Sequence, residues 1–454
     1  MDCAVRESIA VCEQSCRQEM RLLGIQGISH LGMNFLRNRK SWFVARGNLA
    51  RWDIVYALIA FPAGLLMIIY DRYPARNDSE AHWLRALQVA SGIIFPFRDP
   101  SGNDRYGGID AGGSFVSFNN TAVNSPFLYF PTAISQLFFR NASSHVQYMA
   151  ASISTLLCSV ICIAVAIHIA GRFANLIAAV AFLPTVFLSL IFPTADAVTN
   201  SFSLLFVAVV FNYVAAKGRT GLRSVLILSV LCILLGQIKT TCFVLLLLVS
   251  LIIWKRWVID HRFAFEYLVP CILGGASEFL WLWKIRDVSP WLLSYQEYVL
   301  GKKLLMEHPL KFLQSCAATL IQPLDLSKDR YNVQRNIQIY TGTETTMLPM
   351  PVMVIFFLVI VMFVLTANSR IYNDDIKIRK GTVIKIEILL GFILVLFYVA
   401  TCAAMALVMG FNQANMGKSI DGMQSRYFVP ILPIILTMLT LPEWGMQLYN
   451  TKVM

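Results

Sequence analysis

The sequence predicts an all-α polytopic membrane protein with about ten transmembrane helices and large outer loops. Apolar residues make up 57% of the 454-residue chain, and charged residues only 14%. Several apolar stretches are long enough to cross a hydrocarbon core of about 30 Å. Basic residues gather in short segments between these stretches, as the positive-inside rule expects of cytoplasmic loops. These observations together predict the fold class.

Ten apolar segments fit membrane spans when the chain is followed from its amino end. A helix rises about 1.5 Å per residue, so about twenty residues make one crossing. The predicted spans are 53–70, 146–170, 174–193, 199–216, 223–236, 240–254, 263–283, 347–367, 386–410 and 429–448. The predicted transmembrane domain therefore covers 53–448, after a polar segment, 1–52, and before a short tail, 449–454.

The apolar run 223–254 needs a separate argument, because it is too long for one straight crossing and too short for two full ones. Basic residues flank it on both sides, so both of its ends should be cytoplasmic. The run must then turn back at Gly236 to Lys239. We expect a short helical hairpin with Lys239 near its outer tip. Backbone without partners at this depth is tolerated only against protein or a wet cavity, so the tip should line a cavity.

Charge also orients the chain, with both termini cytoplasmic and the outer loops at 71–145, 284–346 and 411–428. The net charge of +12 then reflects basic residues retained at the cytoplasmic face and needs no nucleic-acid partner. The expected partner is the lipid bilayer. The short inner loops carry the clearest charge pattern: Arg172, Lys217 to Arg223, Lys255 to Arg262, and Arg370 to Lys385.

The first outer loop divides into three parts. Residues 78–91 have the spacing of an amphipathic helix. Asp99 to Asn124 is rich in Gly, Asp and Asn and is expected to be an ordered loop. Pro126 to Phe139 is apolar and aromatic, which favours a segment lying at the membrane surface.

The ten cysteines do not form the pattern of a disulfide framework. Most precede the first span or lie in apolar runs. Cys316 is the one expected in an outer loop, where we predict no partner for it. Cys12 and Cys16 are one helical turn apart, but no second pair stands nearby to complete a four-ligand zinc site, so we predict no metal centre.

Candidate catalytic residues begin the first outer loop. Asp78 and His82 are one helical turn apart, and Arg85 follows on roughly the same face. A carboxylate here, Asp78 or Glu80, suits a general base for an acceptor hydroxyl, with His82 or Arg85 orienting it or holding a phosphate. The alternative is structural, since Asn77 with Glu80 resembles a capping box at a helix start.

Two further charged residues are candidates, one in an outer turn and one within an apolar run. Asp196 stands in the tight turn before the fourth span, where it suits either a substrate-binding role or a helix cap. Lys239 lies within an apolar run, and an ionisable group there is a functional candidate by default. Its alternative is a lysine whose ammonium reaches back to the membrane interface.

The last outer loop ends in a polar cluster with Gln424, Arg426 and Tyr427 directly before the tenth span. An arginine at this level can bind a phosphate through its planar fork of donors. The alternative is an interfacial anchor, a role that suits Tyr427 well.

Four segments of the chain resemble a broad family of bacterial polytopic membrane proteins of unknown function, grouped with the GT-C-type glycosyltransferases. Residues 78–86 (Asp-Ser-Glu-Ala-His-Trp-Leu-Arg-Ala) resemble the pattern Asp-Glu-x-x-His-x-x-Arg-Ala. Residues 422–430 (Gly-Met-Gln-Ser-Arg-Tyr-Phe-Val-Pro) are similar to Gly-x-Gln-Gly-Arg-Tyr-Phe-x-Pro. The weaker matches are 193–201, around Asp196, and 237–241, around Lys239.

This resemblance implies a GT-C-like enzyme of the bacterial plasma membrane. Such enzymes take a sugar from a polyprenyl-phosphate donor and move it to a glycan acceptor. A carboxylate of the first outer loop deprotonates the acceptor hydroxyl, and basic residues of later loops hold the lipid phosphate. The resemblance implies no further cofactor and leaves the metal requirement open.

The chain departs from the family pattern at two positions. Ser79 stands where the family has Glu, with Glu80 one residue later, and Ser425 replaces a Gly. Neighbours on a helix differ by about 100° in direction, so Asp78 and Glu80 point apart. We favour Asp78 as the base because it keeps its spacing to His82.

Two other classes of function fit parts of the same sequence. A transporter or flippase of lipid-linked glycans is one, although such proteins often have paired broken helices. This chain shows one interrupted hairpin, at 223–254, without a counterpart in its other half. A polymerase or ligase of surface polysaccharide is the other, and it too would use outer arginines such as Arg426.

Overall fold

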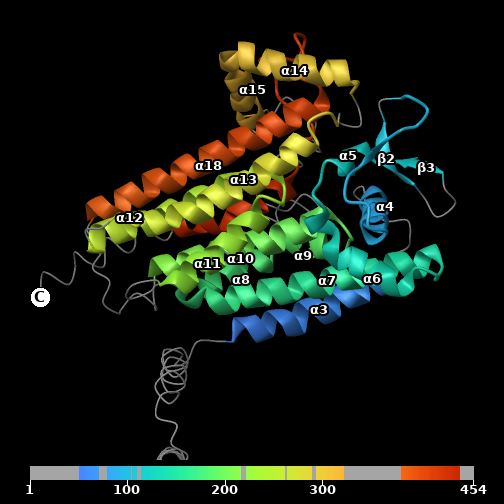
Figure 1. Ribbon diagram of the computed structural model, residues 1–454. Helices are drawn as coiled ribbons and strands as arrows, with labels where there is room; N and C mark the ends of the chain where they lie inside the picture. Colours follow the sequence, from blue (N-terminus) through green and yellow to red (C-terminus); the bar gives the residue numbers. More distant parts are fainter. Residues whose placement is uncertain are drawn as a thin grey trace, which may run out of the picture. The chain divides into compact units, whose positions relative to one another are not determined.

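The computed structural model describes residues 51–70, 79–103, 105–109, 114–215, 221–260, 263–288, 293–321 and 380–439. Figure 1 shows that this part of the chain is mostly helical. Within it, five helices are long and apolar enough to cross a membrane. They are α3 (Trp52–Tyr70), α7 (Ser144–Ile169), α10 (Ala195–Ala215), the continuous stretch of η3 and α12 (spanning Thr240–Trp257), and α18 (Lys380–Met409). The protein is therefore a polytopic membrane protein.

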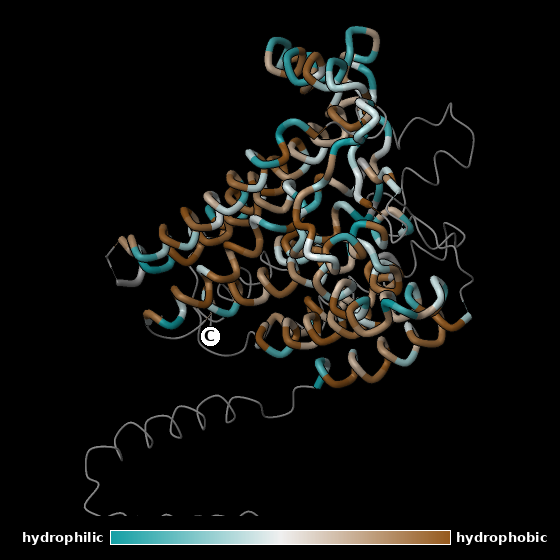
Figure 2. Tube along the Cα trace, turned by 45° about the vertical axis from the view of Figure 1, so that its right-hand side comes forward, coloured by the Kyte–Doolittle hydropathy of each residue, from teal (hydrophilic) through white to brown (hydrophobic). Residues whose placement is uncertain are grey.

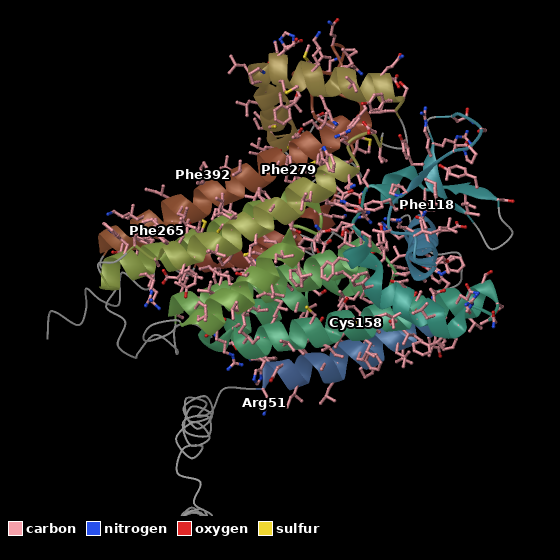
Figure 3. All side chains as sticks on the ribbon, in the orientation of Figure 1. Arg51, Phe118, Cys158, Phe265, Phe279 and Phe392 are labelled. Carbon is pink, nitrogen blue, oxygen red and sulfur yellow. The ribbon has the colours of Figure 1, made fainter. Side chains whose placement is uncertain are left out.

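Helix α10 lies at the centre of this bundle. Most of its length is buried, and it packs against α7, α9, α12 and η7. Small residues such as Ala197, Ser201 and Ala208 line it, which lets neighbouring helices approach closely. Figure 2 shows apolar residues along the long helices, and phenylalanines such as Phe279 and Phe392 are exposed on their surface (Figure 3). The outside of the bundle therefore suits lipid.

The prediction of ten uninterrupted spans does not match the helices of the described residues. Predicted span 174–193 is two short helices, α8 (Ala174–Ala181) and α9 (Pro184–Leu190). Pro184 lacks an N–H and disfavours helical geometry at the residue before it, so the helix breaks there. Predicted span 263–283 corresponds to η4 (Phe265–Tyr267) and the 17-residue α13 (Leu268–Lys284). Predicted span 347–367 and the end of 429–448 lie outside the described residues.

The predicted hairpin in 223–254 is present. Helix α11 (Leu222–Leu235) ends at Gly236, and η3 (Thr240–Leu248) begins after Lys239 and continues into α12 (Val249–Asp260). Gly236 fits closely against α13, where an added Cβ would lie 2.6 Å from the Gly274 carbonyl oxygen. The tip of the hairpin is thereby held against α13.

The predicted helix near 78–91 is α4 (Ser79–Ala90). The expectation of an all-α protein is wrong just beyond it, because three short strands form an antiparallel sheet in the order β1 (Phe97–Arg98), β2 (Tyr106–Ile109), β3 (Phe115–Ser117). The sheet packs on α4, and Gln88 Nε2 donates to the Gly107 carbonyl at 3.1 Å. Gly108 permits this approach, since a Cβ there would lie 2.9 Å from Gln88 Nε2.

The chain returns to the bundle through α5 (Asn119–Ala122), η1 (Pro126–Tyr129) and α6 (Phe130–Phe139). Helix α6 packs along α7, and the hydroxyls of Thr132 and Thr155 meet at 2.9 Å. Its other face exposes Ile134, Leu137 and Phe138. This apolar face is the one that the sequence assigned to the membrane surface.

Two short helices, α14 (Tyr295–Glu307) and α15 (Pro309–Ile321), hold the loop that precedes η7 (Ser425–Ile431). The Gly417 N–H donates to Ser315 Oγ and the Ile420 N–H to Thr319 Oγ1, both at 2.8 Å. Helix α15 also packs on α18, where the Tyr398 hydroxyl donates to the Cys316 carbonyl at 2.9 Å and Cys316 and Cys402 are both buried. Both cysteines are free thiols, as the sequence predicted for Cys316.

Candidate functional site

The candidate site is built on Asp196, the second residue of α10. A carboxylate in the first turn of a helix meets the positive end of the helix dipole, which stabilises its charge. Only 5% of this side chain is exposed. The carboxylate therefore needs further partners, because a buried charge is costly unless it is paired.

Lys239 supplies the first partner. Its ammonium donates to Asp196 Oδ1, and its side chain remains 24% exposed. The turn that carries it is fixed by the neighbouring Gln237, whose amide donates to Ser277 Oγ at 2.8 Å and accepts from Ser125 Oγ at 2.7 Å. The turn of the hairpin thus aims Lys239 at the start of α10.

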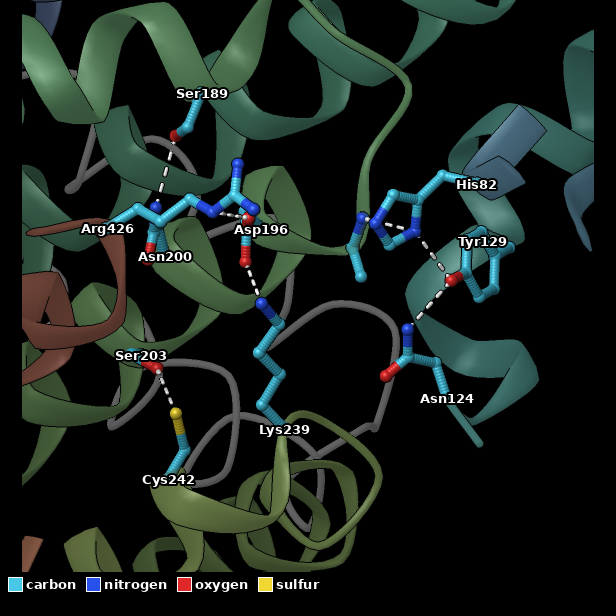
Figure 4. Close-up of polar contacts among 11 residues, drawn as sticks. His82, Asn124, Tyr129, Ser189, Asp196, Asn200, Ser203, Lys239, Cys242 and Arg426 are labelled. Atoms are coloured by element: carbon cyan, nitrogen blue, oxygen red, sulfur yellow. Dashed lines mark hydrogen bonds and ion pairs between the residues drawn. The ribbon is translucent and has the colours of Figure 1, made fainter. Parts of the chain in front are cut away.

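Arg426 supplies the second partner, from η7 near the other end of the chain. Its Nε lies 2.9 Å from Asp196 Oδ2, and 11% of its side chain is exposed. Tyr427 lies beside both cations, with its ring centre 4.9 Å from Lys239 Nζ and 5.7 Å from Arg426 Cζ. Figure 4 shows the carboxylate between the two basic side chains. Gln424 directly precedes η7, makes no capping hydrogen bond through its side chain, and is half-buried.

These charges do not balance. One carboxylate faces an ammonium and a guanidinium group, so the cluster of Asp196, Lys239 and Arg426 carries an excess of one positive charge. Electrostatic attraction is stronger in a poorly hydrated site than in water. The cluster is therefore suited to an anionic ligand.

His82 links α4 to this cluster. Its Nδ1 lies 2.8 Å from the Tyr129 hydroxyl and 3.5 Å from the backbone nitrogen of Ala195, next to Asp196. Burial lowers the pKa of His82 to about 3, a shift that Lys239 and Arg426 reinforce and Asp196 opposes. The imidazole is therefore neutral at physiological pH.

Arg85 lies in the middle of α4, three residues after His82, and its hydrogen bonds go to residues outside the ion cluster. It is fully buried, and its guanidinium donates to Gln88 Oε1 at 2.6 Å and to the Ile94 carbonyl at 2.5 Å. Burial lowers the pKa of Arg85 to about 10, which leaves it charged. These contacts tie α4 to the chain that leads into the sheet, so they give Arg85 a structural role.

Of the two candidate bases, Glu80 and Asp78, the structure describes only Glu80. Glu80 is exposed on the first turn of α4, and Asp78 lies outside the described residues. Among those residues, no three His, Cys, Asp or Glu side chains are grouped so that they could hold a metal ion.

Sequence reasoning missed Tyr129 and Asn124. Asn124 Nδ2 donates to the Tyr129 hydroxyl at 3.0 Å, and both residues face His82 (Figure 4). Tyr129 lies near the start of the apolar and aromatic run 126–139, which predicted a membrane-surface segment. The pattern of that run did not indicate that the Tyr129 hydroxyl has buried polar partners. The only available signal was the single polar pair Asn124-Ser125 before that run.

The apolar helices and the buried ion cluster define a polytopic membrane protein with a polar site at the start of its central helix. Residues 104–435 match the family DUF2142, described as predicted membrane proteins, and the chain belongs to this family. The match includes Asp196, Lys239 and Arg426 and begins after α4. No curated protein and no solved structure matches the chain.

Proposed function

We propose that this protein is an integral membrane glycosyltransferase, related to the GT-C enzymes. It moves a sugar from a polyprenyl-phosphate donor to a glycan acceptor on the outer face of the bacterial plasma membrane. The observation that carries the proposal is the positively charged cluster of Asp196, Lys239 and Arg426, which suits the phosphate of such a donor.

The proposed transfer reaction gives each group of site residues a separate role. The acceptor hydroxyl attacks the anomeric carbon of the sugar, its proton passes to a carboxylate, and the bond from that carbon to the phosphate oxygen breaks. Negative charge then grows on the departing lipid phosphate. Lys239 and Arg426 stabilise that charge, and Asp196 fixes the two cations in place. Asp78 is the proposed base, an assignment that rests on the sequence.

Three features support a lipid-linked substrate over a soluble one. The cluster lies at the end of a membrane-spanning helix, its ionic side chains are mostly buried, and Tyr427 flanks both cations. A lipid phosphate lies at the boundary between the bilayer and water, where an interfacial aromatic residue is also stable. The proposed outer position of the site follows from the charge of the predicted inner loops.

Surface glycans from a deletion strain test the proposal. We expect mass spectrometry to show one sugar missing, restored by the wild-type protein but not by Arg426→Gln, because the variant loses one of the two cations. Arg286→Gln is the matched control, since Arg286 is exposed and its guanidinium pairs with the exposed Asp287. Immunoblots of membranes would establish equal protein levels.

Other outcomes of this experiment would contradict the proposal. Glycans of normal structure but altered amount, rescued equally by Arg426→Gln, would indicate a transporter of lipid-linked glycans. Shorter polymers built of complete repeat units would indicate a polymerase or ligase.

The identity of the base is tested in the same strain. We expect Asp78→Asn to abolish transfer, because an amide cannot accept the proton, while Glu80→Gln retains it. The reverse result would assign the base to Glu80. Full activity of both variants would refute a carboxylate mechanism in this loop.

A further inference from the structure

The hydrogen bonds around His82 determine which of its ring nitrogens carries the proton. The Ala195 N–H is the first of α10, and the first N–H groups of a helix have no partner within it. This N–H can only donate, and it points to His82 Nδ1 at 3.5 Å. Nδ1 must therefore present a lone pair, and the neutral ring carries its proton on Nε2.

The hydrogen bonds of Asn124 and Tyr129 independently indicate that His82 Nδ1 carries no proton. The Tyr129 hydroxyl has one proton and accepts a hydrogen bond from Asn124 Nδ2 at 3.0 Å. Its own proton is then available for His82 Nδ1, 2.8 Å away. Burial raises the pKa of Tyr129, so the hydroxyl keeps this proton. The three side chains form one directed chain of donors that ends on Nδ1 (Figure 4).

The surroundings also oppose a doubly protonated ring. The positive end of α10 faces the imidazole, and Lys239 and Arg426 lie close enough to disfavour a further positive charge. Asp196 acts in the opposite direction, but its carboxylate is shared between those two cations. His82 thus remains a neutral ring with a fixed tautomer.

We propose that Asn124 and Tyr129 are positioning residues that hold His82 as a neutral hydrogen-bond donor through Nε2. In this role His82 donates to an anionic oxygen of the substrate and does not remove a proton from the acceptor. A ring nitrogen that already carries hydrogen is no base, so proton removal falls to a carboxylate. The identity of that oxygen as a lipid-phosphate oxygen rests on the proposed function; the tautomer does not.

Nitrogen NMR of the purified, ¹⁵N-histidine-labelled protein tests the tautomer without any activity assay. The His82 signals are those lost in His82→Gln. We expect a pyridine-type Nδ1 and a pyrrole-type Nε2 in the wild type, and a shift toward the other tautomer in Tyr129→Phe. Tyr148→Phe should leave the signals unchanged, because the Tyr148 hydroxyl donates to Ser79 Oγ at the start of α4. A pyrrole-type Nδ1 in the wild type, or no shift in Tyr129→Phe, would overturn the assignment.

The donor role is tested in the glycan assay. The amide nitrogen of a glutamine side chain reaches about as far as Nε2, and that of asparagine about as far as Nδ1. We expect His82→Gln to retain about 10-fold more transfer than His82→Asn, the effect of one hydrogen bond to a charged group. Equal loss in both variants would refute the donor role. A deletion strain with unchanged glycans would refute the proposed function instead, and the NMR result would stand separately.

Discussion

Replacing Asp196 with asparagine is expected to abolish activity and to lower the free energy of unfolding by roughly 3–5 kcal/mol, the range measured when one partner of a buried ion pair is removed. The variant leaves Lys239 and Arg426 close together with no carboxylate between them. Both are then desolvated cations that repel each other. Thermal unfolding in detergent and the glycan assay would measure the two effects.

A second variant separates charge repulsion from general damage. Adding Lys239→Met to Asp196→Asn removes one of the two cations, so part of the lost stability should return while activity stays absent. Asp287→Asn is the control, because its carboxylate is exposed and only loosely paired with Arg286, at 3.6 Å. Unfolding of Asp196→Asn at the wild-type temperature would show that the ion cluster does not stabilise the fold.

Replacing Gly236 with alanine is expected to destabilise the protein by about 1–3 kcal/mol, as overpacking does in other tightly packed sites. The backbone at Gly236 is ordinary, with φ −68°, so alanine causes no strain of its own. The added Cβ would lie 2.6 Å from the Gly274 carbonyl oxygen and 2.9 Å from the backbone nitrogen of Glu278. Helices α11 and α13 must then separate, which displaces the turn that carries Lys239.

Gly275→Ala is the matched control on α13, since its Cβ would approach no atom closer than 3.8 Å. We expect Gly236→Ala to lower both the melting temperature and sugar transfer, and Gly275→Ala to leave both unchanged. Equal melting temperatures for the two variants would show that the turn does not depend on this helix contact.

The sequence predicted the members of the site better than their arrangement. Charge on both sides of 223–254 was enough to predict the turn at Lys239, because topology follows from local composition. Nothing local shows that Lys239 and Arg426 meet at one carboxylate, since that contact depends on packing between segments far apart in the chain. The same holds for Tyr129, whose partner His82 lies 47 residues away.

The errors in the fold have equally specific causes. The run 174–193 is continuously apolar, and hydropathy alone does not register the break that Pro184 imposes. The small sheet at 97–117 was missed because its strands are two to four residues long, too short for an alternating pattern.

The distance along the chain between Asp196 and its partners matters during biosynthesis. The ribosome makes Asp196 long before either cation, and Lys239 follows 43 residues later. An unpaired carboxylate is costly in lipid. We therefore expect α10 to insert stably into the bilayer only together with the hairpin that carries Lys239. That first pairing is electrically neutral. The excess positive charge arises only when Arg426 docks, so a nascent chain acquires its affinity for anions at the last step of assembly.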